Sequence, residues 1–243
     1  EVPETVAELR QAILQLAVRG KLVPQDPGDE PASVLLERIE AEKERLYAAG
    51  KIRKPKKLPP VEADEVPFEV PEGWEWVRLG MLGALIRGVS YSKSDAADVP
   101  SPDRAPILRA HNINGVLNFE NLVYVLKEKI KPEQYVKAGD LLIAMSSGSK
   151  NLVGKAAQAN TDYPGAFGAF CGAYRPYVHA LDAYLRWYCQ TDLYRSGVAR
   201  ASQGIGINNL RTSDVLEALI PVPPLSEQRR IVEKVEQLMA LCD

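Results

Sequence analysis

The chain has 243 residues, of which 46% are hydrophobic and 26% charged, with a formal net charge of −2. This composition is typical of a globular protein with one large domain or one domain plus appendages, and it contains no apolar run of about 18 residues that would predict a membrane span. The three cysteines, Cys171, Cys189 and Cys242, form no C-x-x-C pair, which predicts reduced thiols of a cytoplasmic protein rather than a zinc site or a disulfide framework.

The charge is distributed unevenly along the chain. Residues 1–79 carry 12 basic and 16 acidic side chains, whereas residues 80–220 carry 15 basic and 12 acidic ones. The middle of the chain is therefore mildly basic between acidic flanks. This distribution permits a nucleic-acid-binding face on the middle part without requiring one.

The first 50 residues predict two amphipathic helices. A capping box formed by Thr5 and Glu8 predicts the start of the first helix, and Gly20 predicts its end. The second helix is predicted over 32–49, with Gly50 as its stop. Apolar residues at helical spacing predict the buried faces, which are Val6, Leu9, Ile13 and Leu16 in the first helix and Leu35, Leu36, Ile39 and Leu46 in the second.

A basic, proline-containing connector, KIRKPKKLPP at 51–60, follows and is predicted to be an extended linker rather than a phosphate-binding segment. Residues 74–79 then alternate as a half-buried strand should. Between 80 and 221 the sequence predicts one helix, over 181–198, among short strands separated by turns. The predicted strands are Pro106–Arg109, Leu122–Leu126, Asp140–Met145, Lys155–Ala159 and Ala166–Pro176.

The last 18 residues predict a further helix. Ser226 is its predicted N-cap, and Glu227 lies in the first turn, where the helix dipole favours a carboxylate. A narrow seam of coiled-coil type is predicted from Ile231, Val235, Leu238 and either Leu241 or Cys242. Because no C-cap signal precedes residue 243, we expect this helix to continue in the intact protein.

One stretch, GDLLIAMSSGSKNLVGK at 139–155, predicts a buried strand that ends in a small, polar loop. Such a loop presents backbone N–H groups and short donors to a ligand. A phosphate-binding P-loop needs four residues between its glycines and then Lys-Ser/Thr, but five residues separate Gly148 from Gly154, and Ala156 follows Lys155. Nucleotide binding is therefore disfavoured. A loop that approaches some other phosphate and a hairpin without a ligand both remain open.

Sequence motifs for catalysis are missing. The two histidines, His111 and His179, have no cysteine or carboxylate at metal-ligand spacing. The sequence contains no H-E-x-x-H, G-x-S-x-G or Asp/Glu-x-Lys signature. No catalytic centre or metal site is predicted.

Four segments together resemble the specificity subunit of type I restriction–modification systems. They are LRQAILQLAVRGKLVPQDPGDEPASVLLERIEAEKERL (9–46), VPEGWEWVRLG (70–80), GDLLIAMSSG (139–148) and IPVPPLSEQRRIVEKVEQL (220–238). The family has two target-recognition domains, each of which reads half of a bipartite DNA site, separated by long antiparallel helices. The resemblance implies an α+β fold in which a mixed, β-rich recognition domain is flanked by helices that form part of a coiled-coil spacer.

This chain departs from the family pattern because it has room for one recognition domain. The expected division is a helical lead-in and basic linker over 1–73, a target-recognition domain over 74–221, and the start of a spacer helix over 222–243. This order is that of the N-terminal half of a specificity subunit, and a half-size subunit that dimerises is the alternative.

The resemblance also implies a function without catalysis by this chain. We expect it to read double-stranded DNA and to dock modification subunits, with the restriction subunit joining in the full complex. S-adenosylmethionine, ATP and Mg²⁺ are expected on those partners and not here. One alternative is a helical assembly protein that does not itself bind DNA, and another is a nucleotide-dependent enzyme.

The expected DNA contacts lie in three loops and one weaker set. The first loop is 90–94, the second is 146–151 with Lys155, and the third is 201–209 with Arg200 and Arg211 nearby; 109–114 is the weaker set. Lysine and arginine suit phosphates or guanine, whereas asparagine and glutamine suit adenine. The candidates are Ser90, Tyr91, Lys93, Arg109, Asn112, Asn114, Ser146, Ser147, Ser149, Lys150, Asn151, Lys155, Arg200, Gln203, Asn208 and Asn209.

Overall fold

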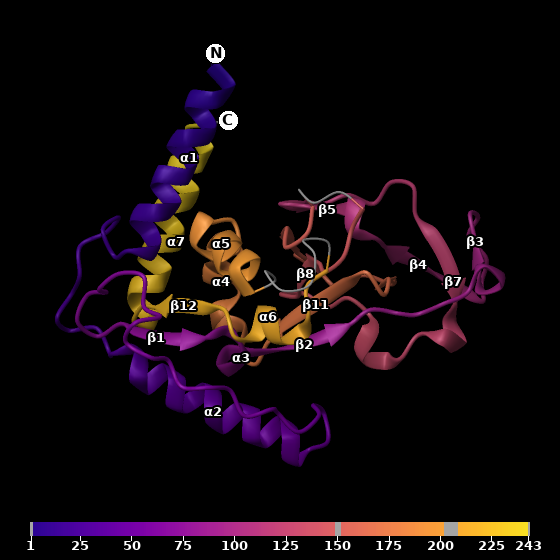
Figure 1. Ribbon diagram of the computed structural model, residues 1–243, viewed down its shortest axis with the longest axis horizontal. Coiled ribbons are helices and arrows are strands. Elements are labelled where there is room, and N and C mark those ends of the chain that lie inside the picture. The colour runs from indigo at the N-terminus through magenta and orange to yellow at the C-terminus, as the bar shows by residue number, and fades with distance from the viewer. Residues whose placement is uncertain (1, 149–151, 202–208, 243) are drawn as a thin grey trace. The chain divides into compact units, whose positions relative to one another are not determined.

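A computed structural model describes residues 2–148, 152–201 and 209–242 of the chain, and its elements are shown in Figure 1. The chain forms two compact units. The first takes in residues up to 82, 177–197 and those from 216 onward, and the second takes in 83–176 and 198–215. Helices and several sheets occur together, which confirms the α+β class, whereas the coiled-coil spacer stays a prediction.

The units do not follow the division expected at residues 74 and 221. Strand β1 (Glu75–Arg78) pairs antiparallel with β12 (Leu219–Val222), so that Glu75 lies opposite Val222. This pairing places both ends of the expected recognition domain in the first unit. The expected recognition domain, 74–221, thus takes in residues of both units, and its bounds stay a prediction.

The first unit is mainly helical. Helices α1 (Val2–Val18) and α7 (Leu225–Ala240) lie side by side, as Figure 1 shows. The other elements assigned wholly to this unit, besides β1 and β12, are α2 (Ala32–Ala48), α3 (Leu79–Leu82), η5 (His179–Leu181) and α4 (Asp182–Tyr188). Helices α5 (Asp192–Ala201) and α6 (Thr212–Leu216) cross the boundaries between the units. Among the residues described, no helix is both long and apolar enough to cross a membrane.

Both predicted N-caps are wrong. Helix α1 begins at Val2, so Thr5 lies inside it, and α7 begins at Leu225, so Ser226 lies inside its first turn. The residue before α7 is Pro224, whose carbonyl accepts the N–H of Gln228 at 2.9 Å. The proline carbonyl therefore starts the hydrogen-bond ladder of α7.

The helix ends and buried faces match the sequence in part. Gly20 and Gly50, with φ of +66° and +67°, follow the ends of α1 and α2 as predicted. In α1, however, Leu9 and Leu16 are 51% and 42% exposed. The buried side chains of the two long helices at the termini are Ile13, Leu14, Ala17 and Val18 in α1 and Glu227, Gln228, Ile231, Val235 and Met239 in α7.

The helix predicted over 181–198 is two helices, α4 and α5. The break contains Thr191, whose buried hydroxyl accepts the N–H of Tyr194 at 3.1 Å and donates to the carbonyl of Tyr188 at 2.7 Å. This hydroxyl supplies the cap for the start of α5. The pair Thr191-Asp192 was a start signal in the sequence that the continuous apolar pattern obscured.

Two polar clusters hold the first unit together. The carboxylate of Glu227 is 1% exposed and accepts from Trp74 Nε1 at 2.9 Å and Gln25 Nε2 at 3.1 Å. The guanidinium of Arg78 anchors the predicted linker, which has no helix or strand. It donates to the carbonyls of Pro59, Pro60 and Glu217 at 2.7–2.9 Å and pairs with Glu65 at 2.6 Å.

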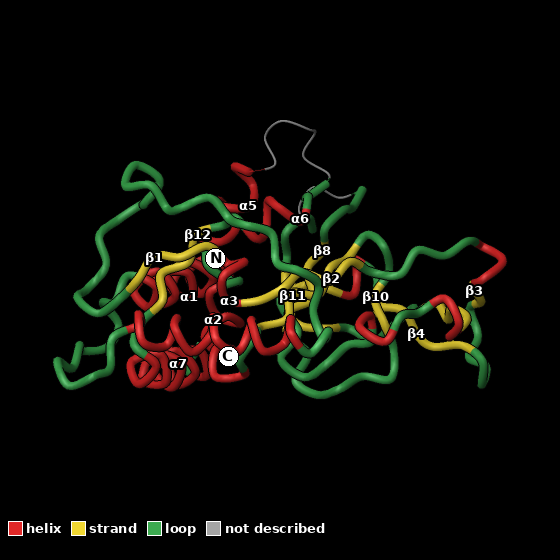
Figure 2. Tube along the Cα trace, turned by 90° about the horizontal axis from the view of Figure 1, so that it is seen from below, coloured by secondary structure: helices red, strands yellow, loops and turns green. Residues whose placement is uncertain are grey.

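Besides residues of α5 and α6, the second unit consists of short strands and connecting loops, which Figure 2 draws in yellow and green. One antiparallel sheet has the order β2-β11-β8-β9, and a second sheet has the order β10-β4-β7-β3, in which only β10 and β4 run parallel. A small ribbon pairs β5 with β6. Their bounds are Gly83–Arg87 (β2), Ala96–Ala97 (β3), Arg104–Leu108 (β4), Ile113–Asn114 (β5), Val116–Leu117 (β6), Val123–Leu126 (β7), Leu141–Ala144 (β8), Ala156–Gln158 (β9), Ala166–Phe167 (β10) and Cys171–Pro176 (β11). Single turns of 3-10 helix occur at Lys93–Asp95 (η1), Ala110–Asn112 (η2), Lys127–Lys129 (η3) and Pro132–Gln134 (η4).

Strand β8 is the centre of this unit. All four of its residues are buried, as its continuous apolar pattern predicts. The strand expected over 166–176 is divided into β10 and β11 by a turn in which Cys171 N–H bonds to the Gly168 carbonyl at 2.8 Å. Cys171 lies in the core, where burial raises the pKa of its thiol to about 12, and Cys189 is also buried and free. Both thiols are therefore buried, Cys171 in the second unit and Cys189 in the first.

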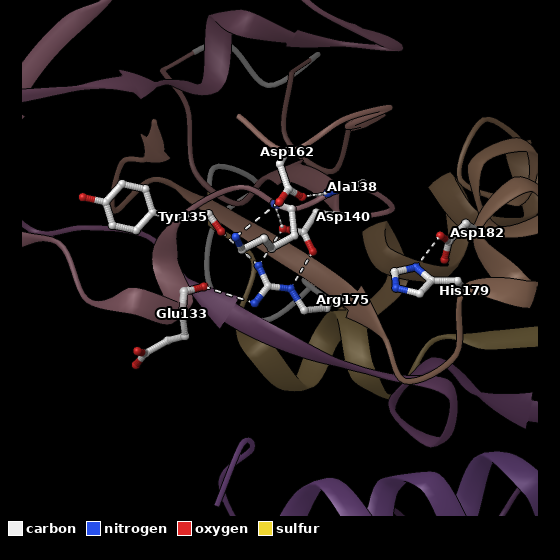
Figure 3. A network of polar contacts seen from close by, with 9 residues as sticks. Glu133, Tyr135, Ala138, Asp140, Asp162, Arg175, His179 and Asp182 are labelled. Atoms are coloured by element: carbon white, nitrogen blue, oxygen red, sulfur yellow. Dashed lines mark hydrogen bonds and ion pairs between the residues drawn. The ribbon is translucent and has the colours of Figure 1, made fainter. Parts of the chain in front are cut away.

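An ion pair fixes the residues that precede β8 (Figure 3). Arg175 of β11 donates Nε and Nη2 to the two carboxylate oxygens of Asp140, each at 2.7 Å, and Asp140 is fully buried. The same carboxylate accepts the N–H of Lys137, while Arg175 also donates to the carbonyl of Tyr135 at 3.0 Å. Figure 3 also draws His179 and Asp182 of the first unit, whose side chains are 3.0 Å apart.

Replacement of the arginine tests this ion pair. We expect Arg175→Met to lower the free energy of unfolding by about 3 kcal/mol or more, because Asp140 would be left buried with one backbone donor. The exposed pair of Lys137 and Asp162, 3.5 Å apart, provides the control, and Lys137→Met should cost less than about 1 kcal/mol. Urea unfolding of both variants measures the difference. Equal losses would show that the buried pair does not stabilise the unit.

Candidate nucleic-acid interface

The two small-residue loops of the sequence meet at the end of β8. Ser146 forms an antiparallel β-bridge with Asn209, and the N–H of Leu210 donates to the carbonyl of Met145 at 2.7 Å. The Ser146 side chain is half-buried and Asn209 is exposed. Backbone hydrogen bonds thus bring together two segments that are more than 60 residues apart in the chain.

The weaker set, 109–114, meets the second loop through Lys155. Its ammonium group lies 2.6 Å from Oδ1 of Asn114 at the end of β5. The backbones of the two segments also pair here, since Gly115 forms a β-bridge with Ala157 of β9. Gly115 has a φ of +76°, which favours glycine in the turn between β5 and β6. Asn114 and Lys155 are therefore neighbours although 41 residues separate them.

Asn112 is fully buried, and the oxygen and the nitrogen of its side-chain amide both form hydrogen bonds within its own loop. Oδ1 accepts the N–H of Arg109 at 2.8 Å, and Nδ2 donates to the carbonyl of Glu120 at 2.9 Å. As it lies, this amide has no free edge for an adenine. We therefore correct the expectation for Asn112, whose side chain shapes the loop, and leave it out of the proposed contacts.

Arg109, close to Asn112 in the chain, is half-buried. Arg109 donates Nη2 to the carbonyl of Asn121 at 2.7 Å, and its buried Nε has no hydrogen-bond partner among the residues described. The side chain of His111 is exposed. Partial desolvation and the charge of Arg109 lower the pKa of His111 from its ordinary value, which favours the neutral imidazole.

Within the loop at 90–94, Tyr91 lies beside Gly168 and close enough to Arg109 to interact with its charge, but the loop then leads away from these residues. It leads into β3, which Figure 1 shows far from β5 within the same unit. Ser92 is used locally, because its hydroxyl and its N–H both donate to Asp95, at 2.7 and 2.9 Å. Tyr91 is half-buried against the core of the second sheet, and burial raises the pKa of its phenol. Ser90 and Lys93 are exposed.

The remaining candidates add little. Ser147 follows the bridge at Ser146 and is half-buried. Arg200 lies within α5. Ser149, Lys150, Asn151, Gln203 and Asn208 lie outside the described residues.

Four cations of the candidate loops form no ion pair with the part of the chain that the structure describes. Within 2–148, 152–201 and 209–242, no carboxylate lies within ion-pair distance of Lys93, Arg109, Lys155 or Arg211. Elsewhere in the same unit Lys129 pairs with Asp95 and Lys137 with Asp162. Unpaired cations beside short polar side chains suit a polyanion.

Sequence reasoning missed one exposed aromatic residue at the end of β8. The carbonyl of Phe170 accepts the N–H groups of both Met145 and Ser146, at 2.9 and 3.0 Å, and its side chain is 68% exposed. The apolar pattern over 166–176 hid it inside a predicted strand. Gly168, two residues earlier, was the signal in the sequence for the turn that exposes it.

The described part of the chain brings together no group of three or more histidine, cysteine, aspartate or glutamate side chains that could hold a metal ion. The arrangement therefore consists of cations, serines, asparagines and one aromatic ring on short, backbone-anchored loops. Such groups can bind phosphates and base edges.

Comparison with known proteins agrees with this chemistry. Residues 71–243 match the family model described as type I restriction modification DNA specificity domain. The EcoAI specificity subunit of Escherichia coli is 35% identical over 98% of this chain, and the EcoKI specificity subunit of E. coli K12 is 39% identical over 72%. The matches cover 41% and 38% of those two relatives, so the chain spans about two fifths of their length.

Solved structures show the same fold. An HsdS subunit from Thermoanaerobacter tengcongensis aligns over 99% of this chain with a TM-score of 0.54 at 20% identity, and over 50% of its own length. A chain from a structure of a type I R-M system aligns over 86% of this chain and 50% of its own, with a TM-score of 0.56 at 24% identity. Since the family model matches well over half of the sequence, the chain belongs to the type I restriction modification DNA specificity domain family.

Proposed function

We propose that this chain recognises one half of a bipartite double-stranded DNA target within a type I restriction–modification complex and docks the modification subunits. The observation that carries the proposal is the junction at the end of β8. There the backbone joins Ser146 to Asn209, and Lys155 lies beside Asn114. Membership of the family supports the same reading.

The roles follow from the chemistry of each side chain. Lys155, Arg109 and Arg211 lack carboxylate partners among the described residues and would contact phosphates, which fixes the register of the protein on the duplex. Asn114, Asn209 and Ser146 would reach base edges, where an asparagine amide suits adenine. The lowered pKa of exposed His111 favours the neutral imidazole, which would add a hydrogen bond rather than a charge.

The proposed chain is a non-catalytic, cytoplasmic subunit without a cofactor of its own. S-adenosylmethionine belongs on the modification subunits, and ATP and Mg²⁺ belong on the restriction subunit of the full complex. What supports this part is membership of the specificity domain family, together with the absence of the catalytic motifs considered from the sequence. Methyl transfer measured with the modification subunits alone and with the subunit added would test it.

A second function, as an assembly protein without DNA binding, is favoured by one observation. Leu9 and Leu16 of α1 and Leu241 beside the end of α7 are 51%, 42% and 84% exposed. Exposed leucines on long helices are typical of protein interfaces. The two functions differ in what a charge change at the candidate loops would do. DNA recognition predicts loss of DNA binding with assembly intact, whereas a pure assembly role predicts no effect.

The decisive experiment uses the intact subunit assembled with its modification subunits. Mapping of methylated sites in a strain that carries the subunit gives the target, and mobility shifts then compare that duplex with one in which the half-site is scrambled. A clear preference for the target supports recognition. Equal affinity for both duplexes at every salt concentration would contradict it.

Neutralisation of Lys155 tests the phosphate contact. We expect Lys155→Gln to weaken DNA binding several-fold near 0.1 M salt and to reduce the slope of log K against log salt by about 0.9, as for the loss of one phosphate contact. Lys137→Gln, at an ion-paired lysine in the same unit, is the matched control and should leave affinity and slope unchanged. Size-exclusion chromatography with the modification subunits checks that assembly persists.

The two asparagines of one loop should behave oppositely. Asn112→Ala leaves the N–H of Arg109 and the carbonyl of Glu120 unpaired, and we expect it to lower the free energy of unfolding by about 1–3 kcal/mol. Asn114→Ala changes an exposed side chain, so stability should change by less than about 0.5 kcal/mol while preference for the target base relaxes. Chemical unfolding and competition binding measure the two effects. Unaltered base preference in Asn114→Ala would remove Asn114 from the interface.

A further inference from the structure

Phe170 is an aromatic side chain exposed where the fold gives no packing reason for it. The ring is 68% exposed, whereas Phe167, three residues earlier, is fully buried. Burial of a phenylalanine side chain is favourable by about 1.5–3 kcal/mol, so its exposure on a folded surface forgoes that stabilisation. An exposed aromatic ring beside a candidate interface offers a large contact area to a ligand.

The backbone of Phe170 is held rigidly. Cys171 N–H closes the turn onto the Gly168 carbonyl at 2.8 Å, and Gly168 N–H donates to the carbonyl of Leu108 at 2.9 Å. The Phe170 carbonyl in turn accepts from Met145 and Ser146. The ring is therefore presented by a turn anchored to two neighbouring segments, which reduces the entropy lost when it contacts a partner.

Its surroundings favour DNA bases over other partners. Through its carbonyl, Phe170 adjoins Ser146, which is bridged to Asn209, so the exposed ring is carried by a turn that borders this junction of short, uncharged polar side chains. Lys155 lies just ahead of β9, and its ammonium group meets Asn114 at the end of β5. An apolar group among short hydrogen-bonding side chains matches the major-groove edge of a thymine, whose C5-methyl adjoins a hydrogen-bond acceptor.

We propose that Phe170 is a specificity-determining residue that contacts the C5-methyl group of a thymine in the major groove. The inference rests on the proposed DNA recognition and adds to it the class of base that this junction reads. It requires at least one A·T pair in the half-site assigned to this chain. Insertion of the ring between two base pairs, as in proteins that kink DNA, is the competing outcome of the test.

The test replaces each thymine of the half-site by deoxyuridine, which removes only the methyl group. The intact subunit, assembled with its modification subunits, is titrated with each duplex. We expect one position at which the wild-type complex loses affinity about fourfold, as for one buried methyl-sized group. In Phe170→Ser the affinity for the unmodified target should fall, and the thymine–deoxyuridine difference at that position should disappear.

Val99→Ser is the matched control, because Val99 is also 68% exposed in the second unit but follows β3, away from the junction. It should retain both the affinity and the thymine–deoxyuridine difference. Thermal unfolding verifies that both variants fold, which is expected because neither side chain is buried. A Phe170→Leu variant should keep part of the difference, since an apolar side chain remains.

The outcomes are distinguishable. If the wild-type complex does not prefer its target over a scrambled duplex, the proposed function fails. If it does, but Phe170→Ser keeps every thymine–deoxyuridine difference, the inference about Phe170 alone is overturned. The inference about Phe170 is also overturned if Phe170→Ser loses affinity but keeps every thymine–deoxyuridine difference, which would indicate ring insertion. A half-site without an A·T pair overturns it as well.

Discussion

The buried ion pair between Asp140 and Arg175 is the constraint on which the second unit depends. It fixes the start of β8 against β11 and closes the loop before it, because Asp140 also accepts the N–H of Lys137. Burial of a carboxylate is costly unless it is paired and hydrogen-bonded, so fully buried Asp140 depends on its guanidinium partner and its backbone donor. Because the ion pair holds the first end of β8 in place, its last residues give the loops that follow a fixed point of attachment.

That fixed point of attachment explains why the candidate loops converge. At the far end of β8, Met145 accepts from Leu210 and shares the carbonyl of Phe170 with Ser146. Each of these contacts is between backbone groups, so none depends on the identity of a side chain. The ion pair at one end and the backbone ladder at the other therefore make β8 a rigid support, which a site for base recognition requires.

Local sequence signals predicted the elements, and long-range contacts decided the rest. The apolar run of β8 and the glycines after α1 and α2 were read correctly because their causes lie within a few residues. The split between α4 and α5 was missed because a single buried hydroxyl, that of Thr191, outweighed a continuous helical pattern. The junction of Ser146 with Asn209 could not be predicted, because the local sequence of neither segment indicates which distant segment it pairs with.

In the candidate site, too, long-range contacts decided what the sequence could not predict, as two asparagines show. Asn112 and Asn114 are chemically identical and were predicted alike, but the carbonyl of Glu120, eight residues away, makes the first a structural residue and leaves the second exposed. Residue type gives the possible chemistry, and only the fold decides which side chains can express it.

Residues that are held by their backbone can change their side chains, and such changes would give the protein a new DNA target. Ser146, Asn209 and Phe170 are placed by their backbone N–H and C=O groups, while their side chains take no part in holding the junction through the hydrogen bonds described. Substitution of these side chains can therefore alter the pattern of donors, acceptors and apolar groups without loss of the frame. Asn112 and Asp140, whose side chains do hold the frame, lack that freedom. New specificity in this fold should thus arise at exposed loop side chains anchored by their backbone, and not at the buried polar residues beside them.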